Sequence, residues 1–273
     1  MPYSNPAAYD RFMGRWSARL APLFIHFAGV QSGQRILDVG SGTGSLSLTL
    51  LASGINVVGL DPVATYVSFA QKAMVDPRIQ FQVGAAEALP FSNEAFDAAL
   101  SLLVLQDLAD PERAVVEMAR VTRRGGTVAA SLWDFEHGLP MLSLFWQAAE
   151  AVAPKAVAHH RSNSPWLLRP YVGPQRLAEL WIGSGLSEVR TTSLELSMDF
   201  SSFDDFWLPF LGEATPTTAF AAAINRETGG DLAKALANNI ADVRGDGSFV
   251  PPARAWAVAG IADHFSVHHS VCC

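Results

Sequence analysis

The sequence predicts an α/β fold built on a mostly parallel sheet, and two observations support this. From about residue 35 to residue 134, short apolar runs alternate with segments of helix length, a pattern typical of β-α-β units. The apolar runs are rich in Val, Ile, Leu and Phe, as expected of parallel strands that are covered on both faces. We therefore expect helices on both faces of the sheet and right-handed crossovers between its strands.

The elements follow in a regular order along the chain. An amphipathic helix is expected over residues 9–27, where large apolar side chains recur every four residues; it could lie on a membrane surface or, more simply, pack on the domain. Strands are expected at residues 35–39, 56–60, 79–83, 96–101 and 127–133, with helices at 44–52, 64–74 and 112–121 between them.

In the second half of the chain, predicted helices no longer alternate regularly with strands. Helices are expected at residues 140–152, 175–184, 203–211, 217–226 and 232–243, strands at 188–196 and 255–261, and an irregular stretch at 153–171. No repeat or flexible linker interrupts the sequence, so we expect one domain over residues 1–273. Within it, we expect residues 30–133 to form a ligand-binding core and the insertions 134–172 and 199–252 to form a helical cap over it.

Composition narrows the classes of function. The chain has 273 residues, of which 49% are hydrophobic and 16% are charged, which suits a folded protein with a large core. Its 19 Lys and Arg against 26 Asp and Glu give a net charge of −7. The positive surplus of a nucleic-acid-binding protein is therefore missing, and a small-molecule substrate is expected instead.

The ends of the chain bear on its compartment. Both cysteines, Cys272 and Cys273, are the last two residues, so neither can close a long disulfide loop, which favours a reducing compartment. No secretory signal or membrane-spanning run is evident, so we expect a cytoplasmic protein without a stable membrane anchor. His268, His269 and these cysteines lack the spacing of a zinc site, and no metal is expected.

A glycine-rich turn follows the first predicted strand. Gly40, Gly42 and Gly44 allow backbone angles barred to other residues and let a ligand approach the main chain at a helix N-terminus. The G-x-G-x-G spacing differs from the G-x-G-x-x-G of dinucleotide sites, and Asp38 lies where a pyrophosphate would be repelled. A cationic or zwitterionic ligand is therefore the better fit.

A second carboxylate follows in the same β-α-β unit. Asp61 ends the second predicted strand, where a carboxylate can accept hydrogen bonds from the two hydroxyls of a ribose. Each feature alone has a structural explanation, as a tight turn or a helix cap. Together they favour a nucleoside-containing ligand.

Four segments resemble the class I S-adenosylmethionine-dependent methyltransferases, in particular the type 11 branch related to the ubiquinone and menaquinone biosynthesis C-methyltransferases. They are ILDVGSGTGSLSLTL at 36–50, VVGLDP at 57–62, the run at 84–126, and YDRFMGRWSARLAP at 9–22. The resemblance implies a Rossmann-like sheet of seven strands with the last antiparallel. It also implies S-adenosyl-L-methionine as cofactor and transfer of its methyl group to the O, N or C atom of a small organic acceptor.

The resemblance also implies roles for the residues of the turn. Gly40, Ser41 and Gly42 would line the methionine part of the cofactor, and Asp38 would steer its ammonium. Asp61 would take the ribose hydroxyls. Pro62 and Val63 would lie beside the adenine.

The family's usual Gly-Asp-Ala-Glu string is Gly84-Ala85-Ala86-Glu87 here. A backbone carbonyl or Glu87 replaces the missing adenine acceptor, or packing alone holds the base. The positions that face the sulfonium end are Ser101, Leu103 and Gln106. The family often has two histidines where Gln106 and Asp107 stand. The resemblance suggests Tyr9, Arg15 and Trp16 as a lid over the cofactor; the alternative is that they only pack the helix on the domain.

A candidate catalytic base, the role of the cap tryptophans and two alternative functions stay open. His137, just past the fifth predicted strand, is a candidate base or a surface histidine. The cap contains several tryptophans, which indicate an apolar or planar substrate pocket or simply core: Trp133, Trp146, Trp166, Trp181 and Trp207. Two alternatives to a methyltransferase are an NAD(P)-dependent dehydrogenase and a non-catalytic scaffold that binds a partner. The sequence assigns neither the acceptor nor the oligomeric state.

Overall fold

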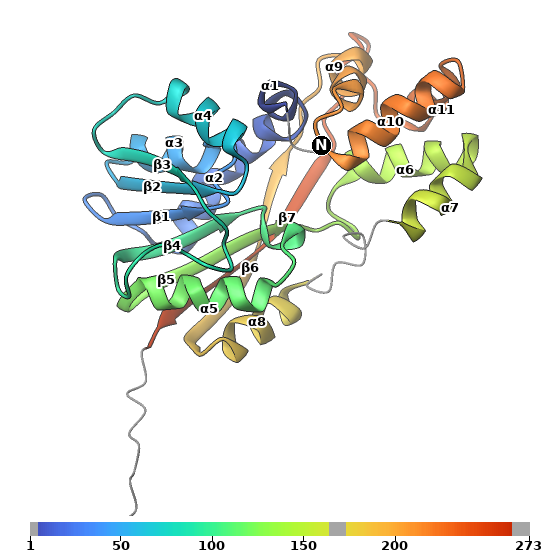
Figure 1. The fold of residues 1–273 in the computed structure, drawn as a ribbon. Coiled ribbons are helices and arrows are strands. Elements are labelled where there is room, and N and C mark those ends of the chain that lie inside the picture. The colour runs from blue at the N-terminus through green and yellow to red at the C-terminus, as the bar shows by residue number, and fades with distance from the viewer. Residues whose placement is uncertain (1–4, 164–172, 264–273) are drawn as a thin grey trace, which may run out of the picture.

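The computed structural model describes residues 5–163 and 173–263, which form a seven-stranded sheet with helices on both faces (Figure 1). The strand order is β3-β2-β1-β4-β5-β7-β6. The strands are β1 (Arg35–Val39), β2 (Asn56–Asp61), β3 (Ile79–Val83), β4 (Phe96–Leu102), β5 (Thr122–Trp133), β6 (Leu186–Ser197) and β7 (Pro252–Ala262). Strands β1 to β5 pair in parallel, and β7 is antiparallel to both β5 and β6. The predicted α/β sheet with an antiparallel last strand is therefore confirmed.

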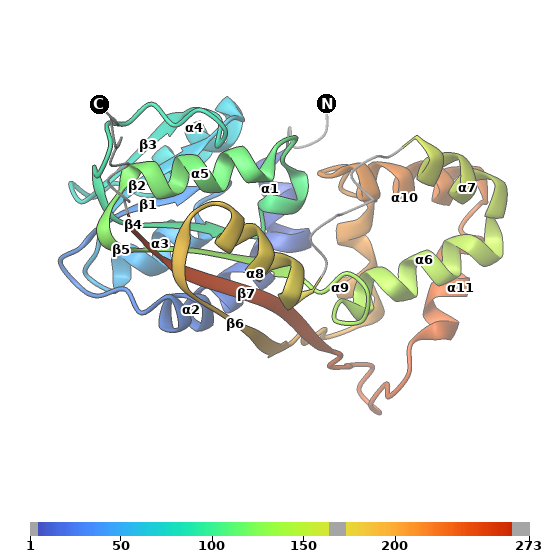
Figure 2. The same ribbon diagram turned by 90° about the horizontal axis from the view of Figure 1, so that it is seen from below.

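The central strands are apolar because helices cover both of their faces. In β1, Leu37 lies opposite Val58 of β2 and Ala99 of β4, and all three side chains are buried. One face is covered by α2 (Arg15–Ala28), α3 (Ser45–Ala52) and α4 (Ala64–Ala73). The other is covered by α5 (Pro111–Val121) and α8 (Pro174–Gly183), which lie in front of the sheet in Figure 2. This layering leaves the carboxyl ends of the parallel strands as the edge where a ligand can enter.

The remaining helices form a separate group, which we call the cap helices. They are α6 (Pro140–Val152), α7 (Pro154–Ser162), α9 (Phe203–Trp207), α10 (Pro216–Glu227) and α11 (Asp231–Asn239), with a 3-10 turn at Leu208–Leu211. Figures 1 and 2 both place them to one side of the sheet, past the carboxyl end of β5. Phe145 of α6 stacks on Phe210 with ring centroids 5.0 Å apart, inside the same apolar cluster as one face of the sheet.

The predicted elements differ from the structure at several places, among them β5, which begins at Thr122 and not at residue 127. The N-terminal helix begins at Pro6 and contains a π-helical turn over Asp10–Gly14 before α2. The irregular stretch expected from residue 153 contains α7, whose polar sequence gave no periodic signal, while residues 164–172 lie outside the described part. Helix α11 ends at Asn239, four residues earlier than expected.

Candidate functional site

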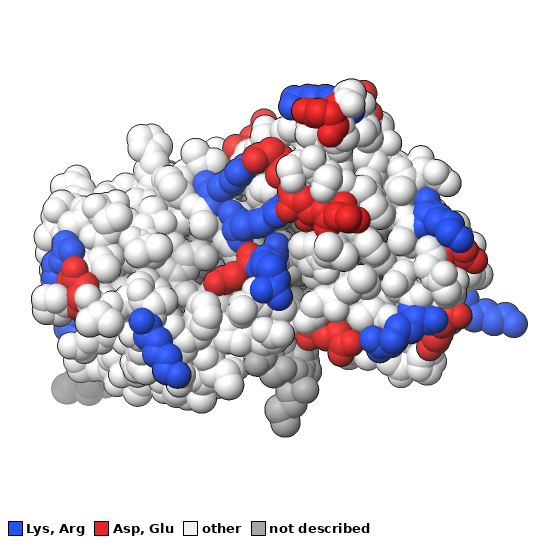
Figure 3. Space-filling model, turned by 90° about the horizontal axis from the view of Figure 1, so that it is seen from above, with Lys and Arg blue, Asp and Glu red and all other residues white. Residues whose placement is uncertain are grey.

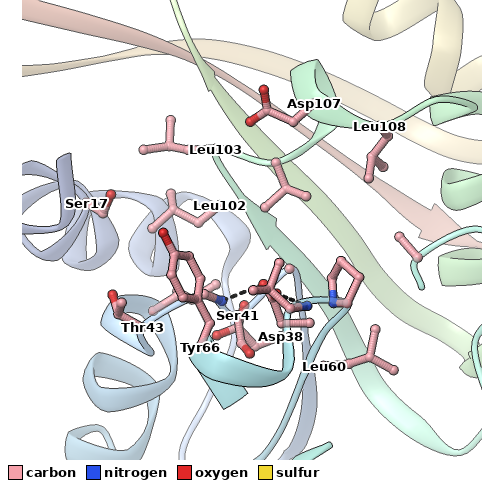
Figure 4. Close-up of a pocket in the computed structure, with 18 of the residues that line it drawn as sticks. Ser17, Asp38, Ser41, Thr43, Leu60, Tyr66, Leu102, Leu103, Asp107 and Leu108 are labelled. Atoms are coloured by element: carbon pink, nitrogen blue, oxygen red, sulfur yellow. Dashed lines mark hydrogen bonds between the residues drawn. The ribbon is translucent and has the colours of Figure 1, made fainter. Parts of the chain in front are cut away.

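A cavity of about 410 Å³ lies at the carboxyl ends of β1, β2 and β4 (Figure 4). Its wall combines the glycine-rich turn after β1, the ends of β2 and β4, and the first turn of α4. Side chains of the N-terminal helices close one side. The volume falls in the range of small-molecule and cofactor sites.

The glycine-rich turn is held against β2 by backbone hydrogen bonds. The amides of Gly40 and Ser41 both donate to the carbonyl of Leu60, at 2.7 and 3.0 Å. Gly40 has a φ of +75°, and a Cβ there would lie 2.4 Å from the side chain of Val104. Only glycine fits this position, which brings the main chain directly to the cavity wall.

Asp61 is 7% exposed and lines the cavity at the end of β2. Its Oδ2 accepts a hydrogen bond from the amide of Gly42 at 2.9 Å, and its Oδ1 accepts one from the amide of Val63 at 2.8 Å. Burial raises the pKa of this carboxyl, and the two amide donors oppose the rise. The hydrogen bonds hold the carboxylate in one orientation while each oxygen keeps a lone pair for a ligand.

Asp38 lies beneath the turn and is 1% exposed. The Ser47 hydroxyl donates to its Oδ2 at 2.6 Å, whereas its Oδ1 has no hydrogen-bond partner among the described residues. Burial raises the pKa of Asp38 to about 7, the Ser47 hydrogen bond lowers it, and the charge of Asp61 raises it further. A buried carboxylate of this kind calls for a cationic partner.

Two further polar atoms in the cavity wall lack partners within the described part of the chain. They are the hydroxyls of Ser41 and Tyr66, both buried. The ring of Tyr66 lies 5.6 Å from that of Tyr9, centroid to centroid, and burial raises the pKa of both phenols, so both stay protonated at neutral pH. Buried polar groups in folded proteins are almost always hydrogen-bonded, so these hydroxyls indicate a place for a polar ligand.

Most of the residues predicted for the cofactor meet at this cavity. They are Tyr9, Asp38, Gly40, Ser41, Gly42, Asp61, Pro62, Val63, Ala85, Ala86, Glu87 and Leu103. Sequence reasoning did not single out Thr43, Tyr66 and Val104, which also line it. For Tyr66 the only signal was its position in the first turn of the helix after Asp61, and that spacing does not say which way the ring points.

The predicted N-terminal lid is placed differently. Arg15 Nη1 lies 2.6 Å from Asp205 Oδ1, and its guanidinium stacks 4.2 Å above the ring of Trp16. Trp16 is 1% exposed and packs edge-on against Phe200. Neither Arg15 nor Trp16 lines the cavity, because Arg15 pairs with Asp205 in α9 and Trp16 packs against Phe200 just before that helix. Of the three lid residues, only Tyr9 reaches the cavity.

Three other predicted residues lie outside the cavity wall. Ser101 is fully buried and donates its hydroxyl hydrogen bond to the carbonyl of Val39 at 3.0 Å, which ties β4 to β1. Gln106 lines a neighbouring cavity instead. The side chain of His137 is 72% exposed, beside Glu136 at 3.7 Å, and lines neither of the two cavities, so its role as a base stays a prediction.

The tryptophans predicted for the cap lie in different parts of the structure. Trp181 is in α8, where its Nε1 donates to the carbonyl of Val128 at 3.0 Å under the sheet, so it is no part of the cap. Trp146 and Trp207 lie in cap helices, and Trp133 ends β5. Trp166, like His268, His269, Cys272 and Cys273, lies outside the described residues.

The outer surface shows mixed charge. On the face drawn in Figure 3, Lys and Arg alternate with Asp and Glu among large uncharged areas and form no continuous basic field. Within residues 5–163 and 173–263, none of the helices is both long and apolar enough to cross a membrane.

This geometry defines an α/β protein with a cofactor-type cavity at the carboxyl edge of its sheet. Residues 37–130 match the family described as "Methyltransferase domain". An uncharacterized protein of Mycobacterium tuberculosis is 35% identical over 121 residues, which are 44% of this chain and 44% of that protein. A demethylmenaquinone methyltransferase of Renibacterium salmoninarum is 32% identical over 145 residues, 52% of this chain and 59% of that protein.

A solved structure shares the fold. Phosphoethanolamine N-methyltransferase 2 of Haemonchus contortus, in complex with S-adenosyl-L-methionine, is 16% identical with a TM-score of 0.58, covering 94% of this chain and 56% of that one. The chain thus spans about half the length of the curated relatives it matches. Residues 37–130 therefore match a methyltransferase domain, and the chain shares its fold with this N-methyltransferase.

Proposed function

We propose that the protein transfers the methyl group of S-adenosyl-L-methionine to the O, N or C atom of a small organic acceptor. The observation that carries this proposal is the buried Asp38, whose Oδ1 has no partner among the described residues and lies beside a glycine turn open to the cavity. An α-ammonium group is a suitable partner for that oxygen.

The charge of the cavity supports the same cofactor. Its described wall contains four carboxylates, Asp38, Asp61, Glu87 and Asp107, and neither Lys nor Arg. A dinucleotide brings a pyrophosphate with negative charge, which such a wall repels. S-adenosylmethionine brings a sulfonium and an ammonium, so the charge of the wall favours it over NAD(P).

Each part of the cofactor has a place in this wall. Asp38 would hold the ammonium, Asp61 would accept hydrogen bonds from the ribose hydroxyls, and the turn from Gly40 to Gly42 would lie along the methionine. Ala85, Ala86 and Glu87 would border the adenine, where a backbone group or packing replaces the aspartate of the family pattern. When bound, the cofactor supplies a methyl group on a positively charged sulfur, an electrophile that needs alignment and exclusion of water more than acid–base help.

Titration calorimetry tests this assignment. We expect S-adenosylmethionine and S-adenosylhomocysteine each to bind at one site per chain and NADH to give no heat of binding. A chain that binds NADH and neither adenosyl compound is a dehydrogenase-type protein. If the adenosyl compounds bind but labelled methyl groups reach no acceptor in a metabolite extract, the non-catalytic scaffold is the better account.

A further inference from the structure

A second, smaller cavity of about 80 Å³ adjoins the first. It shares Tyr9, Leu103 and Asp107 with the cofactor cavity, so the two spaces meet at these residues. Its wall brings together the N-terminal helices, the ends of β4 and β5, and two cap helices. The remaining lining residues are Phe12, Met13, Gln106, Trp133, Phe135, Leu142, Thr215, Pro216 and Thr217.

The chemistry of this wall is mainly apolar and aromatic. Rings come from two segments: Phe12 of the N-terminal helix, and Trp133 and Phe135 at the end of β5, with Tyr9 at the junction. Asp107 supplies a carboxylate to the wall of this second cavity, and Lys, Arg and His are absent from the described lining. A carboxylate or phosphate bound here would lie near the negative charge of Asp107 with no cation in the described lining, which is unfavourable. An uncharged ligand avoids that cost.

Two buried polar atoms of the wall have no partner among the described residues: Gln106 Oε1 and Trp133 Nε1. The Gln106 amide is oriented by its Nε2, which donates to the Leu103 carbonyl and, at 3.1 Å, to Asp107 Oδ2. Its Oε1 is therefore left as an acceptor, while the indole Nε1 is left as a donor. A hydroxyl group is both donor and acceptor, so a hydroxyl-bearing ligand can satisfy both kinds of atom.

We propose that this second cavity binds the methyl acceptor and that the acceptor is an uncharged aromatic hydroxyl compound, a phenol. This inference rests on the proposed function. The aromatic walls receive the ring, Gln106 and Trp133 hold oxygen substituents, and Asp107 lies at the junction with the cofactor cavity. During transfer the phenol O–H bond breaks and its proton passes to the Asp107 carboxylate. The electron pair left on the phenol oxygen forms the new bond to the methyl carbon. The methyl–sulfur bond breaks, and its electron pair remains on sulfur.

Calorimetry on the full chain saturated with S-adenosylhomocysteine tests the ligand class. Phenol and benzoate are the matched probes, because they carry the same ring with a hydroxyl or a carboxylate. We expect phenol to bind and benzoate to bind at least tenfold more weakly. If benzoate binds as tightly as phenol, or if phenol does not bind to the saturated chain, only this inference is overturned. If S-adenosylhomocysteine itself does not bind, the proposed function is overturned as well.

Two variants locate the phenol. Trp133→Phe keeps a ring but removes the indole N–H, so phenol affinity should fall about threefold to tenfold, as for one lost neutral hydrogen bond. Trp146→Phe, in a cap helix outside both cavity walls, is the matched control and should leave phenol affinity unchanged. Equal losses in the two variants, or none in Trp133→Phe, place the phenol elsewhere.

The role of Asp107 has a spectroscopic test that does not depend on turnover. With 4-nitrophenol as probe, ionisation is read from absorbance. At the pH where the free phenol is half ionised, we expect the bound phenol to be neutral, because Asp107 disfavours a second negative charge. In Asp107→Asn, measured at a concentration of S-adenosylhomocysteine that saturates the variant, the bound phenol should be more ionised. An unchanged ionisation in Asp107→Asn contradicts contact between this carboxylate and the acceptor.

Discussion

The two cavities are built in different ways. The cofactor cavity lies on strand ends and backbone amides, and it carries four carboxylates. The second cavity is assembled from side chains of the N-terminal helices, the sheet edge and the cap helices, and most of those side chains are apolar or aromatic. Under the proposed function, the sheet would select the cofactor by charge and backbone shape, while the second cavity, which the cap helices help to form, would select the acceptor by apolar fit.

The strongest way to separate the two regions is to damage the cap core. Phe145→Ala removes a fully buried ring that stacks on Phe210 at 5.0 Å, so we expect it to lower the free energy of unfolding by about 3–5 kcal/mol. Denaturant titration measures this loss. The folded variant should still bind S-adenosylhomocysteine within about threefold of wild type.

The control is Leu208→Ala, a cap residue that is 58% exposed and whose replacement should change stability by less than about 0.5 kcal/mol. A folded Phe145→Ala protein without affinity for S-adenosylhomocysteine contradicts the division between sheet and cap.

On the sheet side, Asp61 should matter most for the cofactor. Asp61→Asn replaces one carboxylate oxygen by an NH2 group, which cannot accept the hydrogen bond that Gly42 or Val63 donates to that position, and it weakens the contacts with the ribose. We expect a tenfold to hundredfold loss of S-adenosylhomocysteine affinity by calorimetry, from about 1.5–3 kcal/mol of charge-assisted hydrogen bonding. The exposed Asp204→Asn, in the cap, is the matched control and should bind as wild type does.

Asp38 predicts a pH dependence that the second cavity does not share. Its pKa of about 7 in the free protein means that it is mostly protonated at pH 6 and mostly ionised at pH 7.5. Only the ionised form attracts the ligand's ammonium, so S-adenosylhomocysteine affinity should rise about fivefold to tenfold over this interval and then level off.

The raised pKa of Asp38 also determines how the stability of the free protein changes with pH. Without ligand, the contribution of Asp38 is greatest at low pH and is lost as the pH rises through about 7. Asp38→Asn should therefore stabilise the free protein more at pH 7.5 than at pH 6 and should flatten the pH dependence of binding. A binding profile in that variant as steep as in wild type assigns the dependence to another group.

The smallest expected effect concerns Arg15, which links α2 to the cap. Its ion pair with Asp205 is partly exposed, with both side chains 29% accessible, and its stacking on Trp16 adds to the contact. Arg15→Met keeps the aliphatic stem, so we expect a loss of only about 0.5–1 kcal/mol in stability. S-adenosylhomocysteine affinity should not change, whereas a tenfold loss restores Arg15 as a cofactor ligand.

The sheet could be predicted from the sequence because its signals are local. Apolar runs such as residues 35–39 and 56–60 alternate with helices, and this rhythm alone defines the strands and their parallel pairing. Asp38, Gly40 and Asp61 were predicted for the same reason: the carboxyl ends of neighbouring parallel strands lie at one edge, so spacing along the chain becomes proximity in space.

The acceptor side could not be predicted in this way. Gln106, Trp133 and Thr217 line one cavity because segments far apart in the sequence pack together: Phe12 packs against Phe210, and α10 packs on the 3-10 turn that contains Phe210. No periodic pattern encodes that long-range packing. His137 was a candidate on its position after β5, but the loop there turns its side chain to solvent. Helix α7 was missed since its polar sequence has no apolar stripe.

Hydrogen exchange with and without S-adenosylhomocysteine tests the central claim most directly, because it reports where the ligand binds. We predict that saturation protects the backbone amides of residues 39–47 and 60–66, which form the glycine-rich turn, the start of α3 and the end of β2 with the start of α4. Protection confined to other segments, or none at a saturating concentration, would show that the cavity at the sheet edge is not the cofactor site.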